Sequence, residues 1–395
     1  MLPTLGLYLH IPFCIRKCAY CDFYSLCGDS MKERYCDALL LHMQDYAPSA
    51  MAKEVDTVFI GGGTPTSLSR SQLLDLIAGV KRHFNLAPDA EFTLECNPAT
   101  VTRADLKKYR RAGVNRLSIG CQSLHEEELA ALGRIHTVED FYDAFEDARD
   151  AGFDNISVDL MYGIPGQTRE SLRATLEKIV ALGPEHISLY NLILEEGTPL
   201  WEARDHLSLP DEDTEYEMYE SAVIYLESYG YNQYEISNFA KEGYACAHNL
   251  KYWNCEEYLG LGPAAHSYYN ERRFSFKRDL DAYIDAMELP DEGIDILDEC
   301  YDVRPAERVG EYVMLRMRLK EGVDTVAFGE RFGIDFERMY GKYLKLYTEN
   351  GFMNHVGNRY FFTLKGMYVS NYILSAMLEF DSNLARGIAR GTDRV

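Results

Sequence analysis

Three cysteines near the N-terminus form the strongest chemical signal in the sequence. Cys14, Cys18 and Cys21 follow a C-x3-C-x2-C spacing and come directly after an apolar segment that we predict to be a strand. Thiolates are the usual ligands of iron–sulfur clusters, so these side chains would hold three irons of a [4Fe–4S] cluster. The fourth iron would stay open to the amino and carboxylate groups of S-adenosylmethionine (SAM). A reduced cluster supplies the electron for reductive cleavage of SAM.

Two other roles are open to these cysteines. They could be purely structural, or they could bind zinc. Zinc normally takes a fourth protein ligand, and the sequence has no second C-x2-C or H-x3-H pair to provide one. We expect the other seven cysteines to be free thiols; they are Cys27, Cys36, Cys96, Cys121, Cys246, Cys255 and Cys300.

A glycine run follows the next predicted strand, VDTVFI. In Gly61-Gly62-Gly63-Thr64-Pro65 the consecutive glycines let the backbone approach a ligand closely. They would face the amino group of SAM. A tight turn between a strand and a helix would need the same residues.

Polar residues recur at later strand ends. Glu95 and Asp159 could accept hydrogen bonds from a ribose diol, Gln122 lies at a similar position, and Arg134 could pair with the carboxylate of SAM. Each residue alone would more often be a helix cap or part of a surface ion pair. Their shared position at strand ends favours a binding role.

A third group combines histidines, aromatic residues and glycines. His248 begins the motif HNLKYW, and His266 follows the segment YLGLGPAA. Imidazole is a common axial ligand of heme iron, and aromatic faces pack on porphyrin planes, so His248 is our first candidate for a heme contact. Histidines packed in an aromatic core are the more common alternative.

These residues lie on a regular alternation of predicted strands and helices. From residue 5 to about 236, short β-rich runs alternate with amphipathic stretches such as residues 71–84. The pattern predicts an α/β fold, a full or partial barrel of parallel strands. The chemistry of such folds lies at the C-terminal ends of the strands, where these residues fall.

The later part of the chain departs from this alternation. We expect a barrel over residues 1–240, an aromatic and histidine-containing segment with a connection over 241–300, a domain over 301–380 and a tail over 381–395. Residues 274–290 are predicted to be helical. Helices over 307–320, 324–332 and 335–350, followed by a hairpin in NHVGNRYFFT, predict a small helical, winged-helix-like domain.

The composition limits the classes of function. The chain has 395 residues, with 40 Lys and Arg against 63 Asp and Glu, which gives a formal net charge of −23. This balance lacks the basic surface of a nucleic-acid binder. No apolar run reaches the roughly 18 residues of a membrane span, so we expect a soluble cytoplasmic protein.

Together, the motifs LHIPFCIRKCAYCDF, GGGTPT, LECNP, GCQS, SVDLMYGIPGQT and HNLKYW resemble one radical SAM family. This family contains oxygen-independent coproporphyrinogen III oxidase and the heme chaperone HemW, and the resemblance covers about residues 4–378. It implies a partial (β/α)6 barrel followed by a C-terminal helical domain. Carried over by position, it implies cluster ligands at the three cysteines named above. It implies SAM contacts at Tyr8, Tyr20, Gly62, Gly63, Thr64, Glu95, Gln122, Arg134, Asp159 and Ile193.

Two departures distinguish the branches of this family. The oxidases have another cysteine two residues after the third ligand, where this chain has Phe23, and they have a long N-terminal extension, where here 13 residues precede Cys14. Tyr20 also replaces a phenylalanine of the oxidase pattern, and Ile193 a smaller residue. The missing cysteine and the missing extension make the resemblance closest to the heme chaperones, which this chain also resembles in the motif HNLKYW. It implies that the chain binds heme and passes it to a recipient hemoprotein, with an electron donor for the cluster and membrane contact only through the recipient. The alternative is an enzyme, an oxygen-independent coproporphyrinogen III oxidase of porphyrin biosynthesis that decarboxylates propionates.

Overall fold

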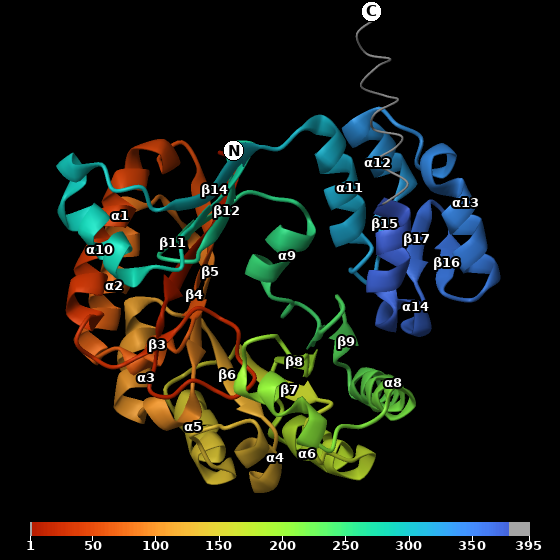
Figure 1. Ribbon diagram of the computed structural model, residues 1–395, viewed down its shortest axis with the longest axis horizontal. Helices are drawn as coiled ribbons and strands as arrows, with labels where there is room; N and C mark the ends of the chain where they lie inside the picture. Colours follow the sequence, from red (N-terminus) through yellow and green to blue (C-terminus); the bar gives the residue numbers. More distant parts are fainter. Residues whose placement is uncertain (1, 379–395) are drawn as a thin grey trace, which may run out of the picture.

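One large twisted sheet organises most of the chain. The computed structural model describes residues 2–378, and the expected tail over 381–395 lies outside this range. The sheet has twelve strands in the order β14-β13-β12-β11-β1-β4-β5-β6-β7-β8-β10-β9. Figure 1 shows helices along its outer side and a smaller group of helices and strands beyond it, coloured blue.

Six neighbouring strands of this sheet are parallel and alternate with helices, so the predicted partial (β/α)6 barrel is confirmed. The six strands are β1 (Thr4–Ile11), β4 (Glu54–Gly62), β5 (Leu86–Cys96), β6 (Arg116–Gln122), β7 (Ile156–Tyr162) and β8 (His186–Asn191). The helices of this part are α1 (Lys32–Ala50), α2 (Arg70–His83), α3 (Arg103–Ala112), α4 (Glu126–Ala131), α5 (Val138–Asp150), α6 (Arg169–Leu182), α7 (Pro199–Glu202) and α8 (Glu212–Ser228).

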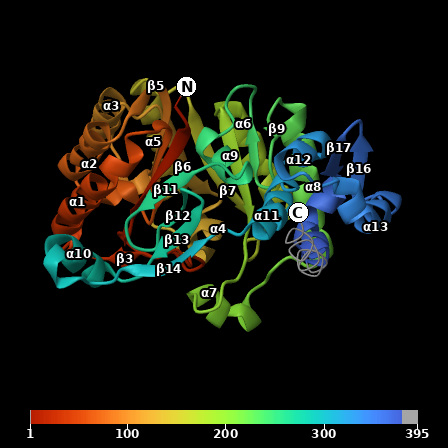
Figure 2. The same cartoon turned by 90° about the horizontal axis from the view of Figure 1, so that it is seen from above.

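Alternation along each strand separates a core face from an inner face. In β1, Leu5, Leu7 and Leu9 are fully buried and belong to the main hydrophobic core, whereas Tyr8 is partly exposed on the opposite face. Successive side chains of a strand point to opposite faces, so the inner face of the barrel carries the other set of residues. Figure 2 shows α1, α2, α3 and α5 on the outer side of these strands.

The helices begin at well-formed caps. Ser69, Thr102 and Thr137 each accept a hydrogen bond from the backbone of the third helical residue, and the side chain of that residue bonds back to the cap. These capping boxes satisfy backbone N–H groups that a helix start leaves free. The strand-to-helix turns therefore hold fixed positions.

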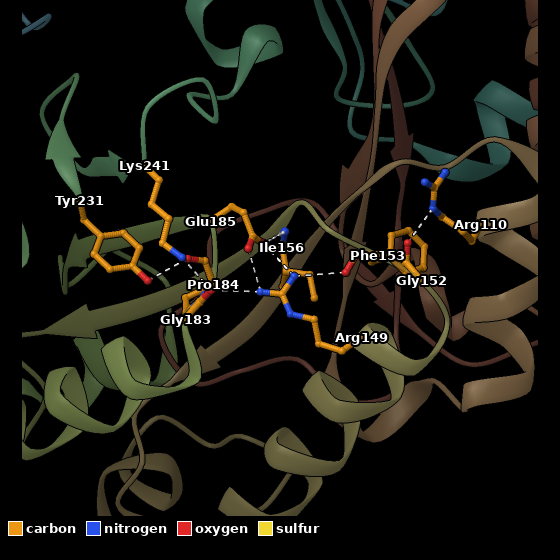
Figure 3. Close-up of polar contacts among 10 residues, drawn as sticks. All are labelled: Arg110, Arg149, Gly152, Phe153, Ile156, Gly183, Pro184, Glu185, Tyr231 and Lys241. Atoms are coloured by element: carbon orange, nitrogen blue, oxygen red, sulfur yellow. Dashed lines mark hydrogen bonds and ion pairs between the residues drawn. The ribbon is translucent and has the colours of Figure 1, made fainter. Parts of the chain in front are cut away.

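A polar network fixes the N-terminal ends of β7 and β8 (Figure 3). Arg149 of α5 donates to both carboxylate oxygens of Glu185 at 2.8 and 3.0 Å and to the carbonyl of Gly183 at 3.1 Å. Glu185 also accepts from the backbone N–H of Ile156 at 3.0 Å, and Lys241 donates to the Gly183 carbonyl at 2.9 Å. This network joins a helix to the starts of two strands.

The segment after the barrel extends the same sheet. It contributes β9 (Asn232–Gln233), β10 (Asn238–Ala240), β11 (Tyr258–Leu261), β12 (His266–Tyr269), β13 (Arg272–Phe276) and β14 (Leu297–Asp302), together with α9 (Ala247–Trp253) and α10 (Leu280–Glu288). The helix predicted over 274–290 is therefore partly wrong, because residues 274–276 belong to β13 and α10 begins at Leu280. Phe274 and Phe276 alternate with Ser275 and pair with β14.

The C-terminal part contains the expected three helices and hairpin. These are α11 (Pro305–Arg316), α12 (Thr325–Phe332), α13 (Phe336–Glu349), β16 (Met353–Val356) and β17 (Arg359–Phe362), joined by β15 (Val323–Asp324) and followed by α14 (Leu364–Tyr368). A three-stranded sheet, β15-β17-β16, packs beside the helices, as in a winged-helix-like fold. Among residues 2–378 no helix has the length and apolar character to cross a membrane.

Candidate functional site

The three cysteines lie together at the C-terminal end of β1. Cys14 belongs to the short strand β2 (Phe13–Cys14), while Cys18 and Cys21 lie in the loop that leads to β3 (Leu26–Cys27). All three are free and partly exposed. Burial raises the pKa of the Cys21 thiol, and the nearby Cys18 and Cys14 thiols raise it further. The three sulfurs are thus close enough to interact electrostatically.

Two of the cysteine sulfurs accept hydrogen bonds from neighbouring side chains. The Thr64 hydroxyl donates to Cys14 Sγ at 3.5 Å, and Arg134 Nη1 donates to Cys18 Sγ at 3.4 Å. Within residues 2–378, no group of three or more His, Cys, Asp or Glu side chains is arranged to hold one metal ion. Thiolates of a cubane bind separate irons, so they need not converge on one position. A set of three thiolates therefore fits a [4Fe–4S] cluster.

The glycine run passes directly beside the first cysteine. A Cβ atom on Gly63 would lie 2.7 Å from the Phe13 carbonyl and 3.1 Å from Cys14 Sγ, so a larger residue does not fit. Gly62 has a φ of +110°, in the region that favours glycine, and its N–H donates to Glu95 Oε2 at 3.1 Å. The turn therefore keeps backbone close to both the cysteine and the carboxylate.

Two carboxylates lie on the inner face of the sheet. Burial, reinforced by the charge of Asp159, raises the pKa of Glu95 to about 8. Burial also raises the pKa of Asp159, opposed by hydrogen bonds from serine hydroxyls. Ser118 Oγ lies 3.0 Å from both Asp159 oxygens and Ser157 Oγ 3.3 Å from one of them. These serines hold Asp159 in one orientation while Glu95 keeps one oxygen toward Gly62.

Arg134 connects the cysteine loop to the sheet. Its Nη2 donates to the Gly120 carbonyl at 2.8 Å, in addition to its contact with Cys18. Gln122, at the end of the same strand as Gly120, has a φ of +66°, which is uncommon for a residue with a side chain. Burial raises the pKa of Tyr20, and the neighbouring Arg134 opposes that rise. Four of the predicted site residues therefore lie together at the C-terminal end of β6: Cys18, Tyr20, Gln122 and Arg134.

Tyr8 and Ile193 differ in how they relate to this group. The Tyr8 hydroxyl hydrogen-bonds to His10 Nδ1 at 3.0 Å, and its pKa is raised by burial and by Glu95. Ile193 follows β8, is 62% exposed and has no polar side-chain group. The structure therefore brings Tyr8 to the carboxylates but leaves Ile193 at the outer margin.

His248 lies at the opposite end of the strands from the cysteines. It is 1% exposed, and its ring nitrogens hydrogen-bond to Thr57 Oγ1 at 2.9 Å and to the Tyr252 hydroxyl at 2.7 Å. Its partner Thr57 precedes Gly63, the glycine beside Cys14, by six residues. Six residues of a strand span about 20 Å, so His248 is far from the cysteines. Burial lowers the pKa of His248 to about 3, so the ring is neutral. In this arrangement neither nitrogen is open to a ligand.

The helix that carries His248 is anchored on the inner face. The carboxylate of Glu91 accepts the backbone N–H groups of Ala247 and His248, both at 3.0 Å, and the thiol of Cys246 at 3.4 Å. Figures 1 and 2 show α9 between the sheet and α11. This helix closes the inner side near the N-terminal ends of the strands.

Sequence reasoning missed several residues of the inner face. A Cβ atom on Gly62 would lie 2.6 Å from the His10 ring, so the His10 side chain packs directly against the glycine turn. His10 Nε2 hydrogen-bonds to the Tyr24 carbonyl at 2.9 Å, and burial lowers its pKa to about 4. Ser118 and Ser157 were also missed. The sequence signal that could have found them is the alternation of side chains along a strand. Residues two positions apart lie on the same face, as Tyr8 does with His10 and Ser157 with Asp159.

Comparison with known proteins identifies the family of this chain. The chain matches the Radical SAM superfamily over residues 8–179 and the HemN C-terminal domain over residues 303–369. The heme chaperone HemW of Bacillus subtilis is 37% identical over 375 residues, which cover 94% of this chain and 98% of that protein. HemW of Escherichia coli is 43% identical over 267 residues, or 67% of this chain and 70% of that protein.

A solved structure shares the fold over nearly the whole chain. Coproporphyrinogen III oxidase (HemN) from Escherichia coli, described as a radical SAM enzyme, superposes with a TM-score of 0.83 and 23% identity. The match covers 95% of this chain and 90% of that one. At this identity the similarity establishes the architecture.

Proposed function

Because this chain belongs to the HemW family of radical SAM proteins, we propose that it is a heme chaperone that binds heme and transfers it to a recipient hemoprotein. The observation that carries the proposal is the match to a HemW protein over 98% of that protein's length. Phe23, where the oxidases have a cysteine, agrees with this branch. We expect the protein to act in the cytoplasm.

The cofactor of this family would bind at the cysteine loop. Cys14, Cys18 and Cys21 would hold the [4Fe–4S] cluster, and bound SAM would supply reductive cleavage chemistry once an electron donor has reduced the cluster. Thr64 and Arg134, which already donate to two of the sulfurs, would stabilise negative charge there.

The remaining predicted contacts would orient SAM. Glu95 and Asp159 face the inner side of the barrel and would accept hydrogen bonds from the ribose hydroxyls. Gly62, Gly63 and Thr64 would present backbone groups to the methionyl part of SAM. The other contacts in this proposal are Tyr8, Tyr20, Gln122, Arg134 and Ile193, of which Tyr20 and Ile193 would contribute apolar surface or backbone groups.

The residue that contacts heme is a separate proposal. His248 remains our candidate, and ligation by it requires both ring hydrogen bonds to break, since Thr57 and Tyr252 occupy its two nitrogens. Glu91→Gln, which weakens the anchor of α9, should then increase heme binding, and His248→Ala should decrease it. If both variants bind heme as the unmodified chain does, His248 is not a heme contact.

The alternative function is that of an oxygen-independent coproporphyrinogen III oxidase, favoured by the fold shared with that enzyme. The test is an anaerobic assay of the reconstituted protein with SAM and a reductant, in which heme and coproporphyrinogen III are supplied in parallel. A chaperone should bind heme stoichiometrically and leave coproporphyrinogen III unchanged. Decarboxylated product together with 5′-deoxyadenosine would instead establish the oxidase.

A further inference from the structure

A fourth cysteine lies beside the first cysteine of the triplet. β2 pairs in parallel with β3, and the register places Cys14 opposite Cys27. The backbone N–H of Leu26 donates to the Pro12 carbonyl at 2.9 Å, which fixes this pairing. Neighbouring strands lie about 4.8 Å apart, inside the range of about 4.4 to 6.8 Å between Cα atoms that a disulfide spans. Residues in register in a ladder also project from the same face.

The two strands differ in how firmly they are held. Phe13 is 2% exposed, packs edge-on against Tyr35 with ring centroids 5.4 Å apart, and accepts a hydrogen bond at its carbonyl from Thr64 N–H at 2.7 Å. These contacts fix the position of Cys14. Cys27 lies in an exposed strand and is a free thiol. An oxidant in solution therefore reaches Cys27 directly, while its partner is already in place.

We propose that Cys27 and Cys14 form a reversible disulfide when no cluster is bound, with a small-molecule disulfide such as oxidised glutathione as the oxidant. The Cys27 thiolate attacks the glutathione disulfide, forming a mixed disulfide and releasing one glutathione thiolate. The Cys14 thiolate then attacks the Cys27 sulfur and releases the second glutathione. Two protein thiols are oxidised, one glutathione disulfide is reduced to two thiols, and the two protons go to those thiols or to solvent.

The other cysteines of the loop are less suited to this reaction. Cys18 and Cys21 lie in a turn closed by a 3.3 Å hydrogen bond from the Cys21 N–H to the Cys18 carbonyl. Neither is a ladder partner of Cys14 among the described residues. The pair Cys14 and Cys27 is therefore the one that the strand register sets up.

The disulfide would control cluster assembly, because it removes one of the three thiolates. This consequence rests on the proposed role of Cys14 as a cluster ligand. The disulfide itself does not depend on that role. In a cluster-free chain the bond would protect Cys14 from irreversible oxidation, and reduction by thiols would restore the ligand.

The test uses the full chain freed of iron by chelation and treated anaerobically with oxidised glutathione. Free thiols are then alkylated, and tryptic peptides are sequenced by mass spectrometry, which distinguishes Cys27 from Cys18 and Cys21 within one peptide. We expect the main product to be a Cys14–Cys27 link that has lost the mass of two hydrogens. Cys27→Ser should lose this link. The control variant is Cys300→Ser, which removes an exposed cysteine of β14 that pairs with Phe274 of β13. This variant should retain the Cys14–Cys27 link.

Three results would overturn the proposal: a link confined to Cys14, Cys18 and Cys21, a Cys27 that is found only with glutathione attached, or no oxidation of Cys14. Assembly of the cluster is then followed by iron content and visible absorbance. Bridged protein should gain a cluster only after dithiothreitol treatment. If the bridged protein gains a full cluster without reduction, Cys14 is not a required ligand and the control of assembly fails, although the disulfide stands.

Discussion

Replacing Glu95 by glutamine should make the cofactor-free protein more stable and its SAM site weaker. The pKa of Glu95 is raised from 4.5 to about 8 by burial and by Asp159. The folded chain therefore holds a proton that the unfolded chain releases above pH 4.5. The contribution of Glu95 to the free energy of unfolding therefore decreases as the pH rises from about 4.5 to 8, and it stays low above pH 8. Glutamine has the same shape, cannot ionise and still accepts from Gly62 N–H.

The size of the effect follows from the shift. At pH 7 the difference from 4.5 corresponds to roughly 3 kcal/mol, since one pKa unit is worth about 1.4 kcal/mol. Glu95 keeps partial contact with solvent, which screens its charge, so we expect a gain of roughly 1–2 kcal/mol. For a chain of this length the gain raises the melting temperature by about 2 °C. At pH 5 most of the gain should vanish, because wild-type Glu95 is then largely protonated.

The assay is thermal and urea unfolding of the cluster-free protein at pH 5 and pH 7, paired with SAM binding to the reconstituted protein. SAM affinity of the unmodified chain should rise between pH 6.5 and 8.5, as the carboxylate ionises, and that of Glu95→Gln should be lower and flat. Glu177→Gln, an exposed residue paired with Arg173, serves as the control and should change stability by less than about 0.5 kcal/mol. A variant that is less stable than the wild type at pH 7, or equally stabilised at pH 5, would refute the reasoning.

Other substitutions test the remaining parts of the structure. Cys18→Ser should abolish the visible cluster absorbance while unfolding stays cooperative, and Cys300→Ser should keep that absorbance; a normal cluster in the first variant would exclude Cys18 as a ligand. His248→Ala should cost about 2–4 kcal/mol, measured by urea unfolding, because it leaves a void and two buried hydroxyls without their partner. A loss below about 0.5 kcal/mol would mean that the ring is not packed as described. Arg149→Ala should cost about 3 kcal/mol because it leaves Glu185 mostly buried and unpaired, whereas Arg169→Ala, in an exposed pair with Glu217, should cost at most about 0.5 kcal/mol; equal losses would contradict the role of the network in Figure 3.

Local patterns predicted the barrel because its strands are short apolar runs separated by amphipathic helices. The run ISVDLMY became β7 (Ile156–Tyr162), and the stretch 71–84 became α2 (Arg70–His83). The error over residues 274–290 has a physical cause. Phe274 and Phe276 read as apolar positions of a helix, but they pair with Cys300 and Leu297 of β14. These partners lie 26 and 21 positions later, and no local period predicts such a pairing.

The division of the chain at residues 240 and 300 remains a prediction. β10 ends at Ala240 and β14 ends at Asp302, so changes of structure occur near both positions. The strands between them nevertheless belong to the same sheet as the barrel. We propose that residues 241–300 form an extension of the barrel rather than an independent unit, since β11 pairs directly with β1.

Motifs in the sequence pointed to candidate site residues whose type is chemically distinctive. They missed residues of common type that matter only because the fold places them on the inner face. Cys14 and Gly63 stand out in any sequence, because few residues can replace them. His10 and Ser118 stand out only after the inner face of the sheet is known. Arg116 is the extreme case. It is 2% exposed and its Nε has no hydrogen-bond partner among the described residues, yet the sequence around it reads as an ordinary strand.

The inner face of the sheet is polar at both ends, which would place the proposed SAM site and the proposed heme contact at opposite ends of the strands. Toward the cysteines, Glu95 and Asp159 keep contact with solvent, so a ligand can replace water there without breaking the core. Toward the N-terminal ends of the strands, Glu91 holds α9 in place through hydrogen bonds, and the His248 ring is buried away from solvent. Heme ligation by His248 would therefore require α9 to move, whereas SAM binding would not. Cluster and SAM content should consequently survive substitutions that release α9.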